Sequence, residues 1–468
     1  MNEKDAVNSN EKESENLISF DNVCKKFLRQ IEGIRDTLPL VMLLISVNST
    51  RASKDLLKFL KSKGVEGEKV KLENEDIHIF RSLEKNATTA STARDIIPVS
   101  LFVSMISQFD SFLGNLIRTI FSIRPEILNS SEKNLTFSKL LQINSIEEAK
   151  EFIVEKEVEA IIRESHTSHF EWLESKLGIP LRKDLPIWAT FIEITERRNL
   201  FVHCDGHVSS QYLTICRNNK VVFEKEIALN DKLSVTAEYF EKSFRCLFEI
   251  SVKLTQVIWR KLLSDDLENA DQGLNTVCFD LLRNEEYDLA DILLDFATRI
   301  IPRHHNAESK TIFVVNKAIA MKFGNIKGGC NHYLESMDWS AFNDKFRLAK
   351  EVLLENYEES VKIMKKIGAE GEIKKSDYKA WPLFTQFRET DLFQNAYREI
   401  FGEEFKAIET PTSMFDRLME QIESSKVTKS EYGKEAEVEI ETKENTEIHE
   451  LAAVAAVEPI PLNPPSPN

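Results

Sequence analysis

The chain has 468 residues, which is more than one ordinary domain, and a formal net charge of −16. Its apolar share of 42% and charged share of 29% are those of a folded globular protein, and they exclude a largely disordered or membrane-embedded chain. The acidic balance argues against broad affinity for nucleic acid through overall charge, but it leaves room for a local basic cleft.

The sequence contains no signal for export or membrane insertion. The longest apolar run, residues 38–45, is too short to span a bilayer. The first residues, Met1-Asn-Glu-Lys-Asp5, lack the basic and apolar parts of a signal peptide. The six cysteines are scattered without a close pair, which is typical of free thiols in a reducing compartment rather than of disulfides or a zinc site. We therefore expect a cytoplasmic protein with no membrane partner.

The N-terminal part of the chain gives few structural signals. Residues 1–16 are polar and charged, and are predicted to be disordered. Residues 17–94 form a segment of unclear role, in which the run 38–45 fits either a buried strand or a core helix. Residues 61–71, rich in Lys, Glu and Gly, predict a turn, and residues 85–94 predict a small polar connector.

From residue 95 onward, apolar residues recur at helical spacing. A capping-box pattern, Ser145-Ile-Glu-Glu148, marks the start of one helix, and Gly178 ends a shorter one. The predicted helices cover about residues 96–121, 146–163, 170–177, 187–203 and 236–263. Four substantial helices with short connections favour a bundle over residues 95–263, so the predicted fold class is mostly α.

One β element is also predicted inside this bundle. Residues 212–216 and 221–225 have strand-like composition, and Arg217-Asn-Asn-Lys220 joins them. Because consecutive asparagines tolerate the left-handed backbone of a tight turn, we predict a small β-hairpin here.

Residues 270–405 have a repeat-like pattern. The string Asn284-Glu-Glu-Tyr287-Asp-Leu-Ala290 returns as Asn356-Tyr357-Glu-Glu-Ser360. The interval between the two tyrosines is twice about 35 residues, close to the tetratricopeptide period of about 34, and residues 316–337 make a looser middle copy. Since each helix pair buries its inner face only by stacking on a neighbour, we predict a tetratricopeptide-like α-solenoid that binds a protein partner. The charged, Ala-rich and Pro-rich residues 420–468 predict a disordered tail.

The most site-like stretch is the predicted helix 187–203, which Asp205-Gly206 ends. Asn199 and His203 are four residues apart and share a face of this helix, and Arg198 lies one position round from Asn199. A cation, an amide and an imidazole are thus gathered near the end of a largely apolar helix.

The surrounding string, Glu196-Arg-Arg-Asn-Leu-Phe-Val-His-Cys-Asp-Gly206, resembles the R-x4-H signature of the HEPN superfamily of RNA-cleaving helical bundles. The form with Asn directly after the Arg is the commonest in that family. The likeness extends over about residues 95–263 and includes Gln108-Phe-Asp-Ser-Phe-Leu113 and Asn230-Asp-Lys-Leu-Ser-Val-Thr-Ala-Glu-Tyr-Phe240. This chain departs from the family at one position: Cys204 follows the His, where the family often has Asn. That position is not a catalytic one.

The resemblance implies metal-independent RNA cleavage by attack of the 2′-hydroxyl on its own phosphodiester, with Arg198, Asn199 and His203 as catalytic residues. Arg198 offers a permanently charged fork to the phosphoryl oxygens, and a histidine, with a reference pKa of about 6.5, suits proton transfer. Asn199 is expected to hold the imidazole or a phosphate oxygen. The resemblance implies no cofactor and no metal. It also implies a symmetric homodimer that forms through the bundle and shares the cleft.

Structural roles for these residues stay open. Arg198 could pair with Glu196, Glu193 or Asp110, and His203 could be a helix-end histidine stabilised by the dipole. Arg197 is the competing arginine, and Asp110, Glu196 and Arg197 are candidate supporting residues.

The other histidines give weaker signals. His203 and His207 have i, i+4 spacing, but Gly206 interrupts the helix, so metal binding is not expected. The pairs His166/His169 and His304/His305 are expected at the surface.

Two hypotheses follow. The first is an endoribonuclease, by resemblance a toxin or antiviral defence effector, regulated through its helical repeats and acting on a specific RNA. The second is a non-catalytic dimeric scaffold that recruits a protein through the repeats. An open cleft that both Arg198 and His203 reach would favour the first, and a sealed core around them the second.

Overall fold

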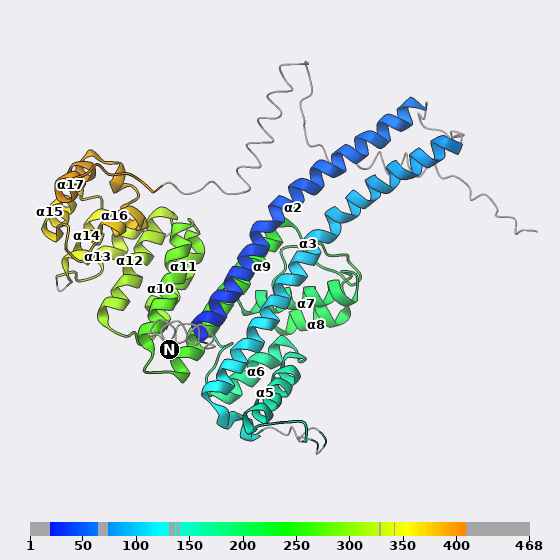
Figure 1. Ribbon diagram of the computed structural model, residues 1–468, viewed down its shortest axis with the longest axis horizontal. Coiled ribbons are helices and arrows are strands. Elements are labelled where there is room, and N and C mark those ends of the chain that lie inside the picture. The colour runs from blue at the N-terminus through cyan, green and yellow to red at the C-terminus, as the bar shows by residue number, and fades with distance from the viewer. Residues whose placement is uncertain are drawn as a thin grey trace, which may run out of the picture. The chain divides into compact units, whose positions relative to one another are not determined.

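The computed structural model describes residues 19–63, 74–130, 136, 138, 141–326, 329–340 and 342–408. These residues are mostly helical and contain no β-strand, which confirms the predicted mostly α class (Figure 1). The segments predicted to be disordered, 1–16 and 420–468, lie outside the described residues, as does most of the turn expected at 61–71.

The chain divides into two compact units. Among the described residues, the first unit contains 19–32, most of 105–233, and most of 241–408, and the second contains 33–63, 74–104 and 234–240. Two long helices, α2 (Phe20–Ser62) and α3 (Asn74–Ile123), each contribute to both units.

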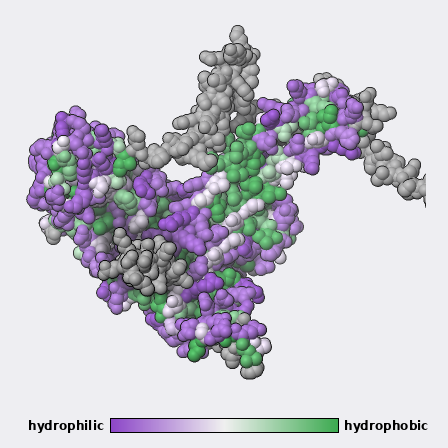
Figure 2. Space-filling view, in the orientation of Figure 1, coloured by the Kyte–Doolittle hydropathy of each residue, from purple (hydrophilic) through white to green (hydrophobic). Residues whose placement is uncertain are grey.

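The second unit is an antiparallel hairpin made by the end of α2 and the beginning of α3. Leu56, Leu60 and Phe80 form its small apolar cluster, and Lys63 pairs with Asp76 at 2.7 Å. Apolar surface remains visible along this hairpin in Figure 2, and Leu44 is 59% exposed.

For residues 17–94 the structure decides one open alternative and corrects one expectation. The run 38–45, left open between strand and helix, is helical and lies inside α2. The connector expected at 85–94 is wrong, because these residues continue α3 without a break. Residues 85–94 contain no Gly or Pro that would end a helix. Ala90 is only 2% exposed, so a small residue here is explained by close packing rather than by a flexible connector.

Part of α3, Glu75–Ile123, is long and apolar enough to cross a membrane by length and composition. In the first unit, however, Met105, Phe109, Leu116 and Phe121 on this helix are at most 2% exposed and form part of the core. A core helix of a folded domain meets the same criterion, so the hydropathy of α3 carries no conclusion about a membrane.

After α3 the chain forms a series of shorter helices, all in the first unit except for residues 237–240 at the start of the last one. These are a 3₁₀ turn (Pro125–Ser130), α5 (Ile146–Ile162), α6 (His166–Leu177), α7 (Trp188–His203), α8 (Ser210–Asn218) and α9 (Ala237–Leu262). The helices predicted near 146–163, 187–203 and 236–263 are confirmed, and α6 begins four residues earlier than predicted.

Local capping signals explain where these helices begin and end. The Ser145 hydroxyl accepts a hydrogen bond from the Glu148 amide at 3.0 Å, and the Glu148 carboxylate accepts one from the Asn144 amide at 2.8 Å. Gly178 ends α6 with a φ of 63°, in the left-handed region that glycine adopts without steric cost.

An aromatic core joins the helices of the first unit. Phe27 at the start of α2 lies 4.9 Å from Phe112 of α3, measured between ring centroids, and Phe109 lies 5.1 Å from Phe191 of α7. Phe170 of α6 contacts Trp188 of α7 at 4.9 Å. These rings fix α3, α6 and α7 side by side, and the candidate site lies on the same three helices.

The predicted β-hairpin at 212–216 and 221–225 is wrong. Ser209 caps a helix instead, accepting a hydrogen bond from the Tyr212 amide at 3.1 Å, and residues 210–218 form α8. Tyr212 and Cys216 are four residues apart and buried with Leu200, so packing of a helical face outweighs the β propensity of the segment. Among the described residues the β pairing is an isolated bridge between His207 and Lys232.

Residues 267–401 fold into further helices of the first unit. They are α10 (Leu267–Arg283), α11 (Tyr287–Asp295), a π-helical turn (Phe296–Ile300), α12 (Ala307–Phe323), α13 (Cys330–Glu335), α14 (Asp344–Leu353), α15 (Tyr357–Ile367), α16 (Lys375–Ala380), 3₁₀ turns Pro382–Phe384 and Phe387–Glu389, and α17 (Asp391–Phe401). Helix α10 packs on α11, α11 on α12, and α14 on α15.

The turns before α11 and α15 have the same backbone conformation. Glu285 and Glu355 both have a φ of 62°, and in each turn the next amide donates to the carbonyl oxygen five residues earlier at 2.9 Å. The two similar strings recognised in the sequence, which contain Tyr287 and Tyr357, therefore each lie where such a turn leads into a helix, α11 or α15.

Candidate active site

Helix α7 holds the three predicted catalytic residues near its C-terminus. Its buried side, including Phe191, Ile194 and Leu200, packs into the bundle. Directly after His203 the chain turns away, through Asp205 (φ 48°) and Gly206 (φ 77°). A Cβ at Gly206 would come within 3.1 Å of the Phe201 ring and 3.2 Å of the Leu233 carbonyl oxygen, so this turn requires glycine.

A cavity of about 430 Å³ opens beside the end of α7. Arg198, Asn199 and His203 all line it, together with Glu196 of the same helix and Asp110 of α3. The C-terminal end of α5 and the N-terminal ends of α6 and α8 complete its wall. The structure therefore brings the three predicted catalytic residues and two of the three predicted supporting residues to one open cavity.

Arg198 is anchored rather than free in this cavity. Its Nη2 donates to Asp110 Oδ2 at 3.0 Å, and its Nη1 donates to Asn199 Oδ1 at 3.1 Å. Its Nε is buried and has no hydrogen-bond partner among the described residues. With a side chain 23% exposed, Arg198 is held in a fixed orientation while part of its guanidinium stays accessible.

Arg197, the competing arginine, does not line the cavity. Its Nε donates to Glu193 Oε1 at 2.7 Å, and the Tyr212 hydroxyl donates to the same oxygen at 2.7 Å. Glu193 is 5% exposed, and burial together with this carboxylate raises the pKa of Tyr212. The Arg197–Glu193–Tyr212 network therefore ties α7 to α8, and Arg197 has its contacts in this network rather than at the cavity.

His203 and Glu196 lie in different environments at the cavity. His203 is exposed, and its ring forms no hydrogen bond or ion pair with the described part of the chain. Glu196 is partly buried, and desolvation raises the pKa of its carboxyl despite the neighbouring His166 and a hydrogen bond with Asn199. Of the three predicted catalytic side chains, His203 is thus the one that no hydrogen bond within the described residues holds in place.

The expectation that His166 and His169 lie at the surface is wrong. They are 9% and 1% exposed, and both line the cavity. The reason is that α6 begins at His166, so both rings fall on the buried face that also carries Phe170, Leu173 and Leu177. This i, i+3, i+4, i+7 pattern was the sequence signal that could have placed them.

His169 is expected to make the stability of the protein depend on pH. Burial, assisted by the neighbouring His166, lowers its pKa from 6.5 to about 4. Between these values the unfolded chain binds a proton that the folded protein does not. The free energy of unfolding should therefore fall by roughly 2–3 kcal/mol as the pH decreases from about 6.5 to about 4.

Urea unfolding at pH 7, 5.5 and 4 measures this loss, and a His169→Phe variant, which keeps a ring but cannot be protonated, serves as its control. The variant should lose less stability than the wild type over this range. Equal losses in the two proteins would show that His169 does not titrate as described.

No protein-family model, curated protein or solved structure matches the chain. Within the described residues there is also no group of three or more His, Cys, Asp or Glu side chains that could hold a metal ion. The choice of a function therefore depends on the chemistry that the cavity residues themselves can perform.

Proposed function

We propose that this protein is a metal-independent endoribonuclease of the HEPN type. The observation that carries the proposal is the joint presence of Arg198, Asn199 and His203 around one open cavity of a helical bundle. This is the arrangement expected if both the arginine and the histidine reach a cleft rather than a sealed core.

The residue types suit cleavage by the RNA's own 2′-hydroxyl. Negative charge builds up on the phosphoryl oxygens in the transition state, and the guanidinium of Arg198 is oriented by Asp110 and Asn199 before the substrate arrives. His203 is exposed at the cavity and can transfer a proton to or from a ribose or phosphate oxygen. The products would be a 2′,3′-cyclic phosphate and a 5′-hydroxyl.

The rest of the chain suits regulation of such an enzyme. We propose a cytoplasmic toxin or defence effector that dimerises through the bundle and cuts a specific RNA. The equivalent turns at Glu285 and Glu355 support tetratricopeptide-like pairing of the C-terminal helices, which would bind a protein partner. A net charge of −16 favours recognition of one structured RNA over indiscriminate digestion.

The proposal is tested by incubating purified protein with total RNA in the presence of EDTA. We expect fragments with 2′,3′-cyclic phosphate ends, and a His203→Ala variant should cleave about 10²- to 10⁴-fold more slowly. His207→Ala is the matched control, because His207 is also exposed but does not line the cavity. Equal cleavage by wild type and His203→Ala would mean that another group performs the reaction.

The alternative is a non-catalytic scaffold, and the ion pair between Arg198 and Asp110 is the observation that favours it. In a scaffold, Arg198 would have no role beyond joining α7 to α3 through this 3.0 Å ion pair. Absence of cleavage together with wild-type behaviour of the His203→Ala protein on expression in cells would support the scaffold.

A further inference from the structure

His166 is a second histidine at the cavity, and it is held more rigidly than His203. It is the first residue of α6, and Ser165 caps this helix by accepting a hydrogen bond from the Ser168 amide at 3.1 Å. Its Nε2 lies 2.9 Å from Asp110 Oδ1, and its side chain is 10% exposed. The ring therefore sits at the cavity wall, fixed by a carboxylate on another helix.

The hydrogen bond to Asp110 decides which ring nitrogen carries the proton. A carboxylate only accepts hydrogen bonds, so Nε2 must donate, and in the neutral ring Nδ1 is then the basic nitrogen. Among the described residues, the hydrogen bond of the His166 ring is made through Nε2, which leaves Nδ1 available. Asp110 thus selects the tautomer in which Nδ1 can accept a proton.

Aromatic packing fixes the orientation of the same ring. The centroid of His166 lies 5.6 Å from that of Phe191 and 6.2 Å from that of Phe109. These contacts and the Asp110 bond together leave His166 little freedom to rotate. Such preorganisation is what a proton-transfer group needs at the moment of reaction.

Asp110 links this histidine to the candidate phosphate-binding arginine. One of its oxygens accepts from His166 Nε2 and the other from Arg198 Nη2, at 2.9 and 3.0 Å. The two functional groups are therefore positioned by one side chain, although they lie on different helices. If Asp110 served only to pair with Arg198 through Oδ2, it would not need His166 on Oδ1, so this second contact favours a role in positioning both groups.

We propose that His166 is a second catalytic residue of this cavity, the general base that removes the 2′-hydroxyl proton of a bound RNA. This inference rests on the proposed ribonuclease function. The O2′–phosphorus bond forms as the phosphorus–O5′ bond breaks, the O2′ proton moves to Nδ1 of His166, and His203 gives a proton to the departing O5′. Exchange with water restores both rings, and Asp110 acts as the positioning residue.

His169, the nearest alternative, is unsuited to this role. Its ring lies 5.2 Å from that of His166, but burial lowers its pKa to about 4, so its ring nitrogens are too weakly basic to take up the 2′-hydroxyl proton. Besides Asp110, the other charged or titratable groups around the cavity are Arg163 and Glu164 at the end of α5, Glu196, Arg198 and His203 on α7, Cys204 directly after α7, and Tyr212 on α8.

The test is a His166→Gln variant, because the glutamine amide can still donate to Asp110 but cannot take up a proton. Single-turnover cleavage of a short RNA is measured from pH 5 to 9, and binding is measured with the same RNA carrying a 2′-deoxy group at the cleavage site. We expect a rate about 10²- to 10⁴-fold lower, unchanged affinity, and loss of the limb in which the wild-type rate rises with pH. His207→Gln is the matched control.

Two outcomes would overturn the inference while leaving the ribonuclease in place. One is wild-type cleavage with an unchanged pH profile, and the other is a rate loss that matches a loss of affinity with the rising limb retained. A wild-type protein that cleaves no RNA would instead reject the proposed function, and this inference with it. If the glutamine variant does not fold, His166→Asn is measured in the same way.

Discussion

Replacing Arg198 with alanine is expected to lower the rate of RNA cleavage about 10²- to 10³-fold, the loss typical when a preorganised donor to a developing negative charge is removed. The same change at Arg197 is expected to act on stability instead. The two arginines are adjacent in the sequence, but Arg198 lines the cavity with Asp110 while Arg197 pairs with Glu193.

For stability we expect the opposite order: removing Arg197 should destabilise the protein more than removing Arg198. Removing Arg197 leaves Glu193, whose side chain is 7% exposed, without its cation, and breaking such a buried pair costs about 3–5 kcal/mol. Asp110 is 21% exposed and keeps its bond to His166 when Arg198 is removed, so that loss should be only about 1 kcal/mol.

The comparison needs single-turnover cleavage and urea unfolding of both alanine variants, with activity measured at a temperature at which each is folded. We expect the Arg197→Ala protein to be the more active of the two and the less stable. If the two variants lose activity equally, the cavity does not distinguish the arginines as proposed.

Replacing Asp271 with alanine is expected to destabilise the protein by about 3–5 kcal/mol, because it breaks a buried charged network. Asp271 on α10 is 3% exposed. Its carboxylate accepts hydrogen bonds from Arg260 Nη2 at 2.7 Å, His304 Nδ1 at 2.8 Å and the His305 amide at 2.7 Å.

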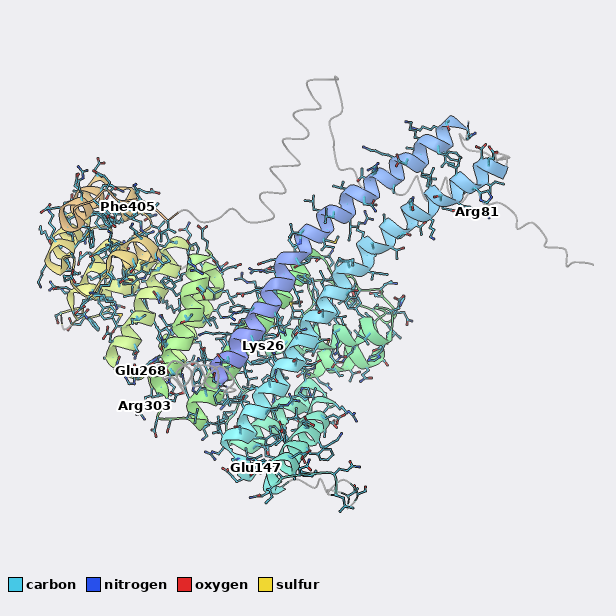
Figure 3. The ribbon with its side chains drawn as sticks, viewed as in Figure 1. Lys26, Arg81, Glu147, Glu268, Arg303 and Phe405 are labelled. Atoms are coloured by element: carbon cyan, nitrogen blue, oxygen red, sulfur yellow. The ribbon has the colours of Figure 1, made fainter. Side chains whose placement is uncertain are left out.

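This network ties the segment after the π-helical turn to α9 and α10. Arg260 also donates to the Arg303 carbonyl, and His305 lies 3.6 Å from Glu268 at the start of α10; Figure 3 labels Arg303 and Glu268. The expectation that His304 and His305 are surface residues is thus wrong for His304, whose side chain is 4% exposed because it fills this network, while that of His305 is 41% exposed.

The same network predicts a dependence on pH. Burial alone would raise the pKa of Asp271, but the hydrogen bonds from His304, the His305 amide and Arg260 outweigh it and hold the pKa below its ordinary value of 3.8. The stabilisation is therefore complete above about pH 4 and is lost as the pH falls through the folded-state value.

Urea unfolding at neutral pH measures the effect of Asp271→Ala, with Asp280→Ala as the control on the same helix. Asp280 pairs with Arg283 at the surface, where both side chains are more than half exposed, and such a pair contributes about 0–1 kcal/mol. Comparable losses for the two variants would show that the buried network does not stabilise this part of the protein.

The sequence alone determined the features that depend on neighbouring residues. The Ser145 cap, the Gly178 stop and the apolar spacing of residues 187–203 all act within one or two helical turns, so the helices they predict are present. The same local geometry placed Arg198, Asn199 and His203 near one another on α7 before any other helix was known.

Only the tertiary structure decided which groups meet across helices. Asp110 is 88 positions from Arg198 and 56 from His166, and no periodicity predicts contacts over such distances. Burial also decided the fate of residues 212–216, where packing of Tyr212 and Cys216 overrode β propensity. The sequence thus determined the helices that carry these local signals and the grouping on α7. The cavity, the place of His166 in its wall and the different partners of Arg197 and Arg198 required the packed helices, because these depend on which face of each helix its neighbours cover.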